Sequence, residues 1–205
     1  IMKAVIARIS PESRIIDITQ DVLPQHIEQA AYLLTTAFPF FFFLTVFISV
    51  VDPSVGTERK PVAVKAAGKY FIAPDNGLLS CLVNQKIVDE AVILDRKEYQ
   101  LTQVSNTFHG RDIFAPAGAH LARGISFSQL GTPTDPHALI QKPLFLNKHN
   151  DDGSIDGRVI HIDRFGNLVT SLQPKDLGSD KKWTFSLDEE NVYDIKRTFS
   201  DVESG

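Results

Sequence analysis

Apolar and polar positions follow two different periods along this chain, and the helical period is confined to its first part. Between residues 2 and 9 apolar side chains recur at i, i+3, i+4 and i+7, which predicts a helix that packs through one face. Pro24 opens a second segment with the same period, which fades near Phe38, and further helices are predicted over 78–83 and 113–124. Short apolar, β-branched runs predict strands at 14–19, 45–51, 62–66, 70–73 and 91–94.

Strands that alternate with helices are typical of an α/β domain with a mostly parallel sheet covered by helices. The polar stretch 147–157 predicts a linker, and beyond it only strand-like runs remain, at 158–162, 168–172, 183–187 and 193–200. The predicted organisation is therefore an N-terminal α/β domain over 1–146, the linker 147–157, and a smaller C-terminal β domain over 158–205.

Composition narrows the class of protein. A net charge of -4 and the lack of a Lys/Arg cluster argue against a nucleic-acid-binding protein. A single cysteine, Cys81, rules out an internal disulfide and a cysteine-based zinc site, and predicts a reducing, cytoplasmic location. The apolar run 38–51 contains Pro39 and is too short for a membrane helix, so we expect a helix end, a connection and a core strand. The N-terminus shows no signal-peptide pattern.

Two charged residues follow the strand predicted at 45–51. Asp52 lies directly at its carboxyl end and Arg59 lies in the Pro-, Ser- and Gly-containing loop that follows. Open α/β sheets bind ligands outside the carboxyl ends of their strands, which makes this pair a candidate site. The alternative is that Asp52 initiates a turn before Pro53 and that Arg59 is a solvated loop residue.

Two further segments carry candidate chemistry. His109 stands beside Gly110 just before the helix predicted over 113–124, and an imidazole with an ordinary pKa near 6.5 suits a general base. The segment Asp163 to Asn167 combines a carboxylate, an aromatic ring at Phe165 and an amide, a set that suits an adenine or amino-acid ligand. Locally, His109 is equally a polar first-turn residue, and 163–167 a hairpin turn.

Several common site motifs are absent from the sequence. The histidines share no metal-ligand spacing, so no metal site is predicted. Neither a G-x-x-x-x-G-K-[ST] loop nor a G-x-G-x-x-G turn occurs, so phosphate-cradling chemistry is not indicated.

Four long motifs taken together resemble one family. VVDPSVGTERKPVAV, YFIAPDNGLLS, TFHGRDIFAPAGAHLARG and GRVIHIDRFGNLVTS occur in the order and approximate spacing of the S-adenosyl-L-methionine hydroxide adenosyltransferases, relatives of the fluorinase and chlorinase enzymes. The resemblance implies an N-terminal α/β domain, a C-terminal antiparallel β-barrel and a homotrimer whose site lies between neighbouring subunits. It also implies an enzyme that hydrolyses S-adenosyl-L-methionine to adenosine and L-methionine, and no cofactor is expected.

The same resemblance suggests roles for individual residues. It places a water-handling triad on Asp52, Arg59 and His109, with His109 as general base, and it places Asp163, Phe165 and Asn167 around the substrate. The His-Gly pair at 109–110, where halide-using relatives carry Tyr-Ser, favours hydroxide as the nucleophile.

The chain departs from the family pattern in several places. The family's first strand and its final barrel strands are expected to lie outside 1–205, and the Phe-rich segment 40–44 replaces a Pro/Lys/Gly-type turn. The alternatives to hydrolysis are adenosyl transfer to a halide such as chloride, a non-catalytic module that binds S-adenosylmethionine or adenosine, and a purely structural oligomerisation unit.

Overall fold

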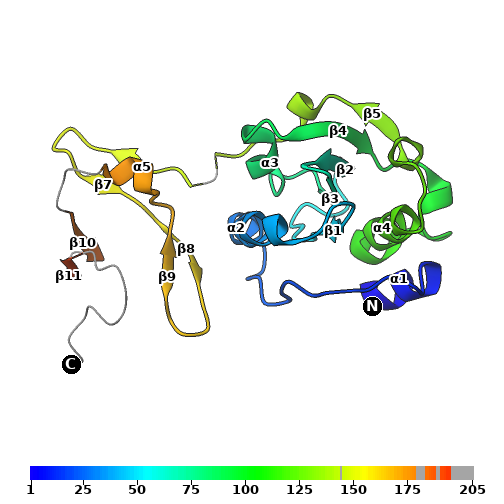
Figure 1. The fold of residues 1–205 in the computed structure, drawn as a ribbon, viewed down its shortest axis with the longest axis horizontal. Helices are drawn as coiled ribbons and strands as arrows, with labels where there is room; N and C mark the ends of the chain where they lie inside the picture. Colours follow the sequence, from blue (N-terminus) through cyan, green and yellow to red (C-terminus); the bar gives the residue numbers. More distant parts are fainter. Residues whose placement is uncertain (144, 179–182, 188–189, 195–205) are drawn as a thin grey trace. The chain divides into compact units, whose positions relative to one another are not determined.

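The computed structural model describes residues 1–143, 145–178, 183–187 and 190–194, the last of these by backbone alone. Contacts divide the chain into two compact units, 1–144 and 145–205. In Figure 1 the first unit runs from blue to green and the second from yellow to red.

The first unit is built on a five-stranded sheet of order β1-β3-β2-β4-β5. The strands are β1 (Val46–Ile48), β2 (Pro61–Ala66), β3 (Lys69–Pro74), β4 (Val88–Ile93) and β5 (Thr132–Thr134). Only β1 and β3 pair in parallel, and the other three pairings are antiparallel. The α/β class is confirmed, but the prediction of a mostly parallel sheet is wrong.

The turn between β2 and β3 explains part of this difference. Ala67 and Gly68, with φ of 48° and 70°, join strands whose last facing pair is Ala66 and Lys69. Two consecutive residues with positive φ form the tight hairpin turn that matches the twist of antiparallel strands. A parallel neighbour would have required a crossover of a dozen or more residues at this point.

The two faces of the sheet bury two separate cores. Successive side chains of a strand point to opposite faces, so Val62 and Val64 of β2 face one core and Ala63 faces the other. The first core is completed by α2 (Ile27–Ala37) and α3 (Ser80–Asn84). The second is completed by the π-helix η3 (Gly110–Phe114), α4 (Ala115–Ala122) and the 3-10 turn η4 (Phe127–Leu130). This two-sided burial explains why the strands read as continuous apolar runs.

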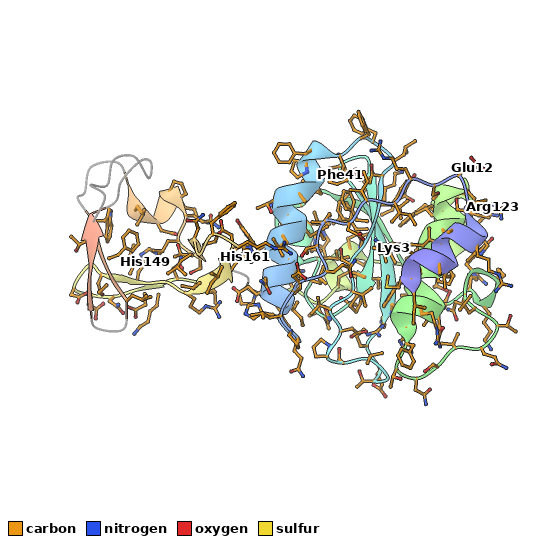
Figure 2. The ribbon with its side chains drawn as sticks, turned by 90° about the horizontal axis from the view of Figure 1, so that it is seen from below. Lys3, Glu12, Phe41, Arg123, His149 and His161 are labelled. Carbon is orange, nitrogen blue, oxygen red and sulfur yellow. The ribbon has the colours of Figure 1, made fainter. Side chains whose placement is uncertain are left out.

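The helix α1 (Met2–Ile9) lies outside this arrangement, along α4. Figure 2 shows the two helices side by side, with Lys3 labelled near α1 and Arg123 labelled near the end of α4. The helices predicted over 2–9, from Pro24 to Phe38 and over 113–124 are confirmed. The shorter 3-10 turns of this unit are η1 (Phe38–Phe40), η2 (Lys97–Tyr99) and η5 (Pro136–Ala138).

Two apolar segments behave differently from each other. The strand predicted at 14–19 does not form; Ile16 is 55% exposed, and Asp17 is bound by Lys3 of α1. The Phe-rich run is, as predicted, a helix end, a connection and a strand, because η1 is followed by a turn and then by β1. In that turn Phe42 and Phe43 are 90% and 77% exposed, and Leu44 has φ of 64°.

The second unit consists of short antiparallel pairs, β6 with β7, β8 with β9 and β10 with β11. They are β6 (Lys148–His149), β7 (Ile155–Asp156), β8 (Val159–Ile162), β9 (Leu168–Thr170), β10 (Thr184–Leu187) and β11 (Glu190–Asp194), with a helical turn α5 (Pro174–Leu177). The pairs do not join into a closed barrel within the described residues. Residues 195–200 of the last predicted strand lie outside the described residues.

The segment predicted as a linker carries structure of its own. Residues 147–157 contain β6 and β7, and the side chain of Asn147 donates to the Ser171 carbonyl at 3.1 Å and to the Asp176 carboxylate at 2.8 Å. The hydroxyl of the buried Ser171 donates to Asn147 in return. Within the described residues no helix is long and apolar enough to span a membrane.

Candidate active site

The topology of the sheet brings the ends of three neighbouring strands to one edge. β1 is parallel to β3 and β2 is antiparallel to it, so the carboxyl ends of β1 and β3 lie beside the start of β2. Asp52 follows β1 and Arg59 precedes β2, which places the two residues at the same edge. The prediction of a site at a carboxyl strand end therefore needs only the β1–β3 pair to be parallel.

Asp52 and Arg59 form a buried, two-pronged ion pair. Arg59 Nε donates to Asp52 Oδ1 at 3.1 Å, and Arg59 Nη2 donates to Asp52 Oδ2. The side chains are only 3% exposed for Arg59 and 6% for Asp52. Fork-to-fork pairing of this kind fixes direction as well as charge. The turn alternative accounts for part of the loop, since Val55 N–H donates to the Asp52 carbonyl at 3.3 Å, but it does not account for the buried pair.

His109 completes the cluster from a distant part of the chain. It is the residue that precedes η3, and its Nδ1 lies 2.9 Å from Arg59 Nη2. A guanidinium has donors and no acceptor, so Arg59 donates and Nδ1 accepts. The neutral ring therefore carries its proton on Nε2, and Nδ1 holds its only basic lone pair.

The surroundings keep His109 in this neutral form. Burial lowers the pKa of His109 below its ordinary value, and the adjacent Arg59 cation lowers it further. The Asp52 and Asp112 carboxylates act in the opposite direction without reversing the shift. An imidazole that is uncharged at neutral pH is the form that can accept a proton.

One donor of Arg59 has no partner. Nη1 is buried and makes no hydrogen bond to any described residue. The guanidinium carbon lies 5.4 Å from the centre of the Phe114 ring, so the cation is packed against an aromatic face as well as against Asp52. Buried donors are nearly always satisfied in folded proteins, so Nη1 is the natural contact for a small ligand or a water molecule.

Two glycines allow the loops around this cluster to approach closely. Gly56 has φ of 81°, and a Cβ there would lie 2.8 Å from the carbonyl oxygen of Asn106, so the loop after β1 packs directly on the loop before His109. At Gly110 a Cβ would lie 3.2 Å from the sulfur of Met2. What approaches the backbone at Gly110 is therefore α1.

Three residues outside the predicted set of site residues also support the site. Asn76 is buried and donates from Nδ2 to the Val51 carbonyl at 2.8 Å, which fixes the peptide next to Asp52. Ser54 Oγ donates to Asp52 Oδ1 at 3.3 Å. Asp112, fully buried, accepts from the Ser105 N–H at 2.8 Å. Each contact spans a loop, and no hydrophobic period signals it.

The predicted substrate-binding residues lie together in the second unit, on the turn between β8 and β9. Asp163 Oδ1 accepts from the backbone N–H groups of Phe165 and Asn167, at 2.8 and 2.9 Å, and Asp163 Oδ2 accepts from the Asn167 side chain at 2.6 Å. These bonds, first among them those from Asn167, lower the pKa of Asp163. Asp163 thus organises the turn, and the Phe165 ring is 92% exposed at its tip.

The described residues contain no group of three or more His, Cys, Asp or Glu side chains that could hold a metal ion. The site is instead an acid, a guanidinium and a neutral imidazole at the edge of an α/β unit. This combination can position and deprotonate a water molecule.

Comparison with known proteins identifies the family. Residues 1–131 match the model of the SAM hydroxide adenosyltransferase N-terminal domain, and 157–205 match that of its C-terminal domain. The chain belongs to the SAM hydroxide adenosyltransferase family.

Named relatives and a solved structure agree with this assignment. The chain is 38% identical over 165 residues to an (R)-S-adenosyl-L-methionine hydrolase of Salinispora arenicola, covering 80% of this chain and 62% of that protein. It is 34% identical over 213 residues to the (R)-S-adenosyl-L-methionine hydrolase of Thermus thermophilus, covering 100% and 79%. A crystal structure of an uncharacterized conserved protein from Thermotoga maritima superposes with a TM-score of 0.86 at 33% identity, covering 100% and 80%. The chain thus spans less than two thirds of the Salinispora relative.

Proposed function

We propose that this protein hydrolyses S-adenosyl-L-methionine to adenosine and L-methionine. The observation that carries the proposal is the buried Asp52–Arg59 pair with the half-buried His109 beside it; Arg59 Nη1 has no partner among the described residues, and His109 is held neutral. Relatives that are named (R)-S-adenosyl-L-methionine hydrolases support the choice of substrate.

The chemistry of the substrate sets the task of the site. A sulfonium is already a good leaving group, so methionine departs without a general acid and the reaction needs no cofactor. The difficulty lies in the nucleophile, because free water is a very weak acid whose pKa lies far above neutral pH. In our proposal Arg59 Nη1 holds one water molecule in line with the ribose C5′.

His109 then acts as the general base. Its proton-accepting atom is Nδ1, because Nε2 already carries a proton, so the Arg59 Nη2 hydrogen bond gives way as the proton arrives. General-base assistance is typically worth about 10²–10⁴-fold in rate. Asp52 keeps the Arg59 guanidinium in place and balances its charge, and the oxygen of the water forms the new bond to C5′ as the C5′–sulfur bond breaks.

The turn of the second unit supplies the proposed substrate contacts. Phe165 stacks on the adenine, Asn167 hydrogen-bonds it, and Asp163 fixes the turn and lies toward the methionine end. A large aromatic ring that is 92% exposed on a hydrogen-bonded turn supports this role, because the turn presents the ring at little cost in conformational entropy.

We further propose that the active form is a cytoplasmic homotrimer, with the second unit built as part of an antiparallel β-barrel and each site shared between subunits. Light scattering should give three times the chain mass of 22.8 kDa. A monomeric mass at assay concentration would contradict the trimer.

Chromatography of S-adenosyl-L-methionine incubated with the protein tests the proposed reaction. Adenosine and methionine should be released in equal amounts, and His109→Ala should slow their release by about 10²–10⁴-fold. Unchanged adenosine release by His109→Ala would sink the general-base role. Chloro-adenosine formed in the presence of chloride would favour the halide-using alternative, and tight binding without turnover would favour a binding module.

A further inference from the structure

Asp112 is a fully buried carboxylate that the proposed reaction does not use. It lies in the π-helix η3, two residues beyond Gly110, and its side chain is 0% exposed. A buried charge is costly unless it is paired and hydrogen-bonded. The contacts that compensate Asp112 therefore indicate what it holds in place.

These contacts run to the loop before His109. Asp112 Oδ2 accepts from the Ser105 N–H at 2.8 Å, and the Asp112 backbone carbonyl accepts from the Leu101 N–H at 2.9 Å. Arg111 donates to the carboxylate through Nε at 2.5 Å and Nη2 at 3.0 Å. Because of these hydrogen bonds, Arg111 first among them, the pKa of Asp112 lies below its ordinary value, so Asp112 is an anion at neutral pH.

Ser105 in turn contacts the imidazole. The pKa of His109 is lowered overall, first by burial and then by Arg59, and the Ser105 backbone acts against this lowering, as a carbonyl near a ring N–H does. The imidazole is thus bound by Arg59 at Nδ1, and it lies beside the Ser105 backbone that Asp112 anchors.

We infer that Asp112 is a positioning residue for the proposed hydrolysis: by anchoring the Ser105 backbone it fixes the orientation of His109. The inference rests on the proposed function, and it assigns a role to a carboxylate that never touches substrate. The charged groups that face His109 are Arg59 and Asp52 from the loop between β1 and β2, and Asp112 from η3. The backbone at Gly110, next to His109, lies against Met2 of α1, which is uncharged.

Asp112→Asn in the full chain tests this role. The substitution keeps the shape of the side chain and removes its charge. We expect plateau kcat to fall about 10- to 100-fold, the range for losing a hydrogen bond to a charged group, with KM within about twofold. The His109 pKa, measured by NMR titration of its imidazole, should fall further because a neighbouring anion is lost. The acid limb of kcat/KM should move to lower pH with it.

Asp95→Asn is the matched control. Asp95 also accepts from a backbone N–H, that of Thr132 at 3.0 Å, but it anchors β5 instead of the loop before His109. Asp95→Asn should leave the His109 pKa and plateau kcat unchanged. An Asp112→Asn variant that loses thermal stability, yet keeps the wild-type His109 pKa and plateau kcat, would overturn the inference and leave Asp112 as a purely structural anchor.

A second variant covers the case in which Asp112→Asn does not fold. Arg111→Gln removes the cation that partly neutralises Asp112, at a side chain that is 36% exposed. It should therefore raise the His109 pKa, and an unchanged His109 pKa would refute the inference. The NMR titration of His109 needs no turnover. A wild-type protein that releases no adenosine would therefore contradict the proposed function, and the titration would still test whether Asp112 positions His109.

Discussion

The buried ion pair between Asp52 and Arg59 gives a quantitative prediction for Asp52→Asn. The two residues share two hydrogen bonds, and their side chains are 6% and 3% exposed. Replacing the carboxylate by an amide keeps the shape of the side chain and removes the charge. Arg59 then remains buried beside a neutral His109 and an aromatic ring, with no counter-charge.

Removal of one partner of a buried pair costs about 3–5 kcal/mol, because the remaining charge is not compensated. For a chain of this size each kcal/mol corresponds to about 2–4 °C in Tm, so Asp52→Asn should lower Tm by about 6–20 °C. Urea denaturation followed by circular dichroism gives the free energy of unfolding directly. The slope of that free energy with urea should stay constant if the denatured state is unchanged.

The matched control is Glu90→Gln, the same chemical change at an exposed ion pair. Lys65 donates to Glu90 at 2.6 Å, with side chains 37% and 49% exposed. Exposed pairs contribute about 0–1 kcal/mol, so Glu90→Gln should shift Tm only slightly. If Asp52→Asn costs no more than Glu90→Gln, the reasoning from burial is wrong and the Asp52–Arg59 pair is solvated in solution.

Further predictions concern pH, a strained turn, the exposed ring and the Asn76 amide. The pKa of His109 in the folded protein lies below its ordinary value of about 6.5, so the unfolded chain takes up this proton first as pH falls. The contribution of His109 to the free energy of unfolding should therefore be complete above about pH 6.5 and decline below it. The acid limb of a pH–rate profile should also lie below pH 6.5. Leu44→Gly should raise Tm by about 2–4 °C, because a backbone φ of 64° costs a leucine roughly 1 kcal/mol and Leu44, which is 69% exposed, packs little. An unchanged or lower Tm in calorimetry would contradict this. Phe165→Ala should leave Tm nearly unchanged but raise KM for S-adenosyl-L-methionine about tenfold, within the range for a base stacked on an aromatic ring; an unaltered KM would exclude the stacking role. Asn76→Ala should cost about 1–3 kcal/mol in urea denaturation, because it leaves the Val51 carbonyl unsatisfied, and a neutral result would show that water replaces the amide.

Local patterns predicted the parts of the fold that are determined locally. The helical period predicted α1 and α2, and the short apolar runs 62–66 and 70–73 predicted β2 and β3. Strand direction was not determined locally, because a strand buried on both faces has the same apolar run in parallel and antiparallel sheets. The run 14–19 failed for a related reason: an apolar pattern does not reveal whether a neighbouring strand is available.

The candidate site also has a part that the sequence predicted and a part that only the structure shows. Asp52 and Arg59 were visible as charges at a strand end, but His109 joined them only through the resemblance of whole motifs to a family. The structure adds the contact between Arg59 Nη2 and His109 Nδ1 and the anchoring contacts of Asn76 and Asp112. These are polar contacts between loops, and loop approach depends on the three-dimensional path of the chain, not on a repeating pattern.

The central claim is that this site delivers the oxygen of water to the ribose C5′ of S-adenosyl-L-methionine. Turnover in water enriched in oxygen-18, followed by mass spectrometry of the nucleoside, tests it most directly. The wild-type protein should form adenosine with one oxygen-18 at its 5′-hydroxyl together with an equal amount of methionine, and His109→Ala should form much less of both. A product without the label, a halogenated nucleoside, or no adenosine from the wild-type protein would contradict it.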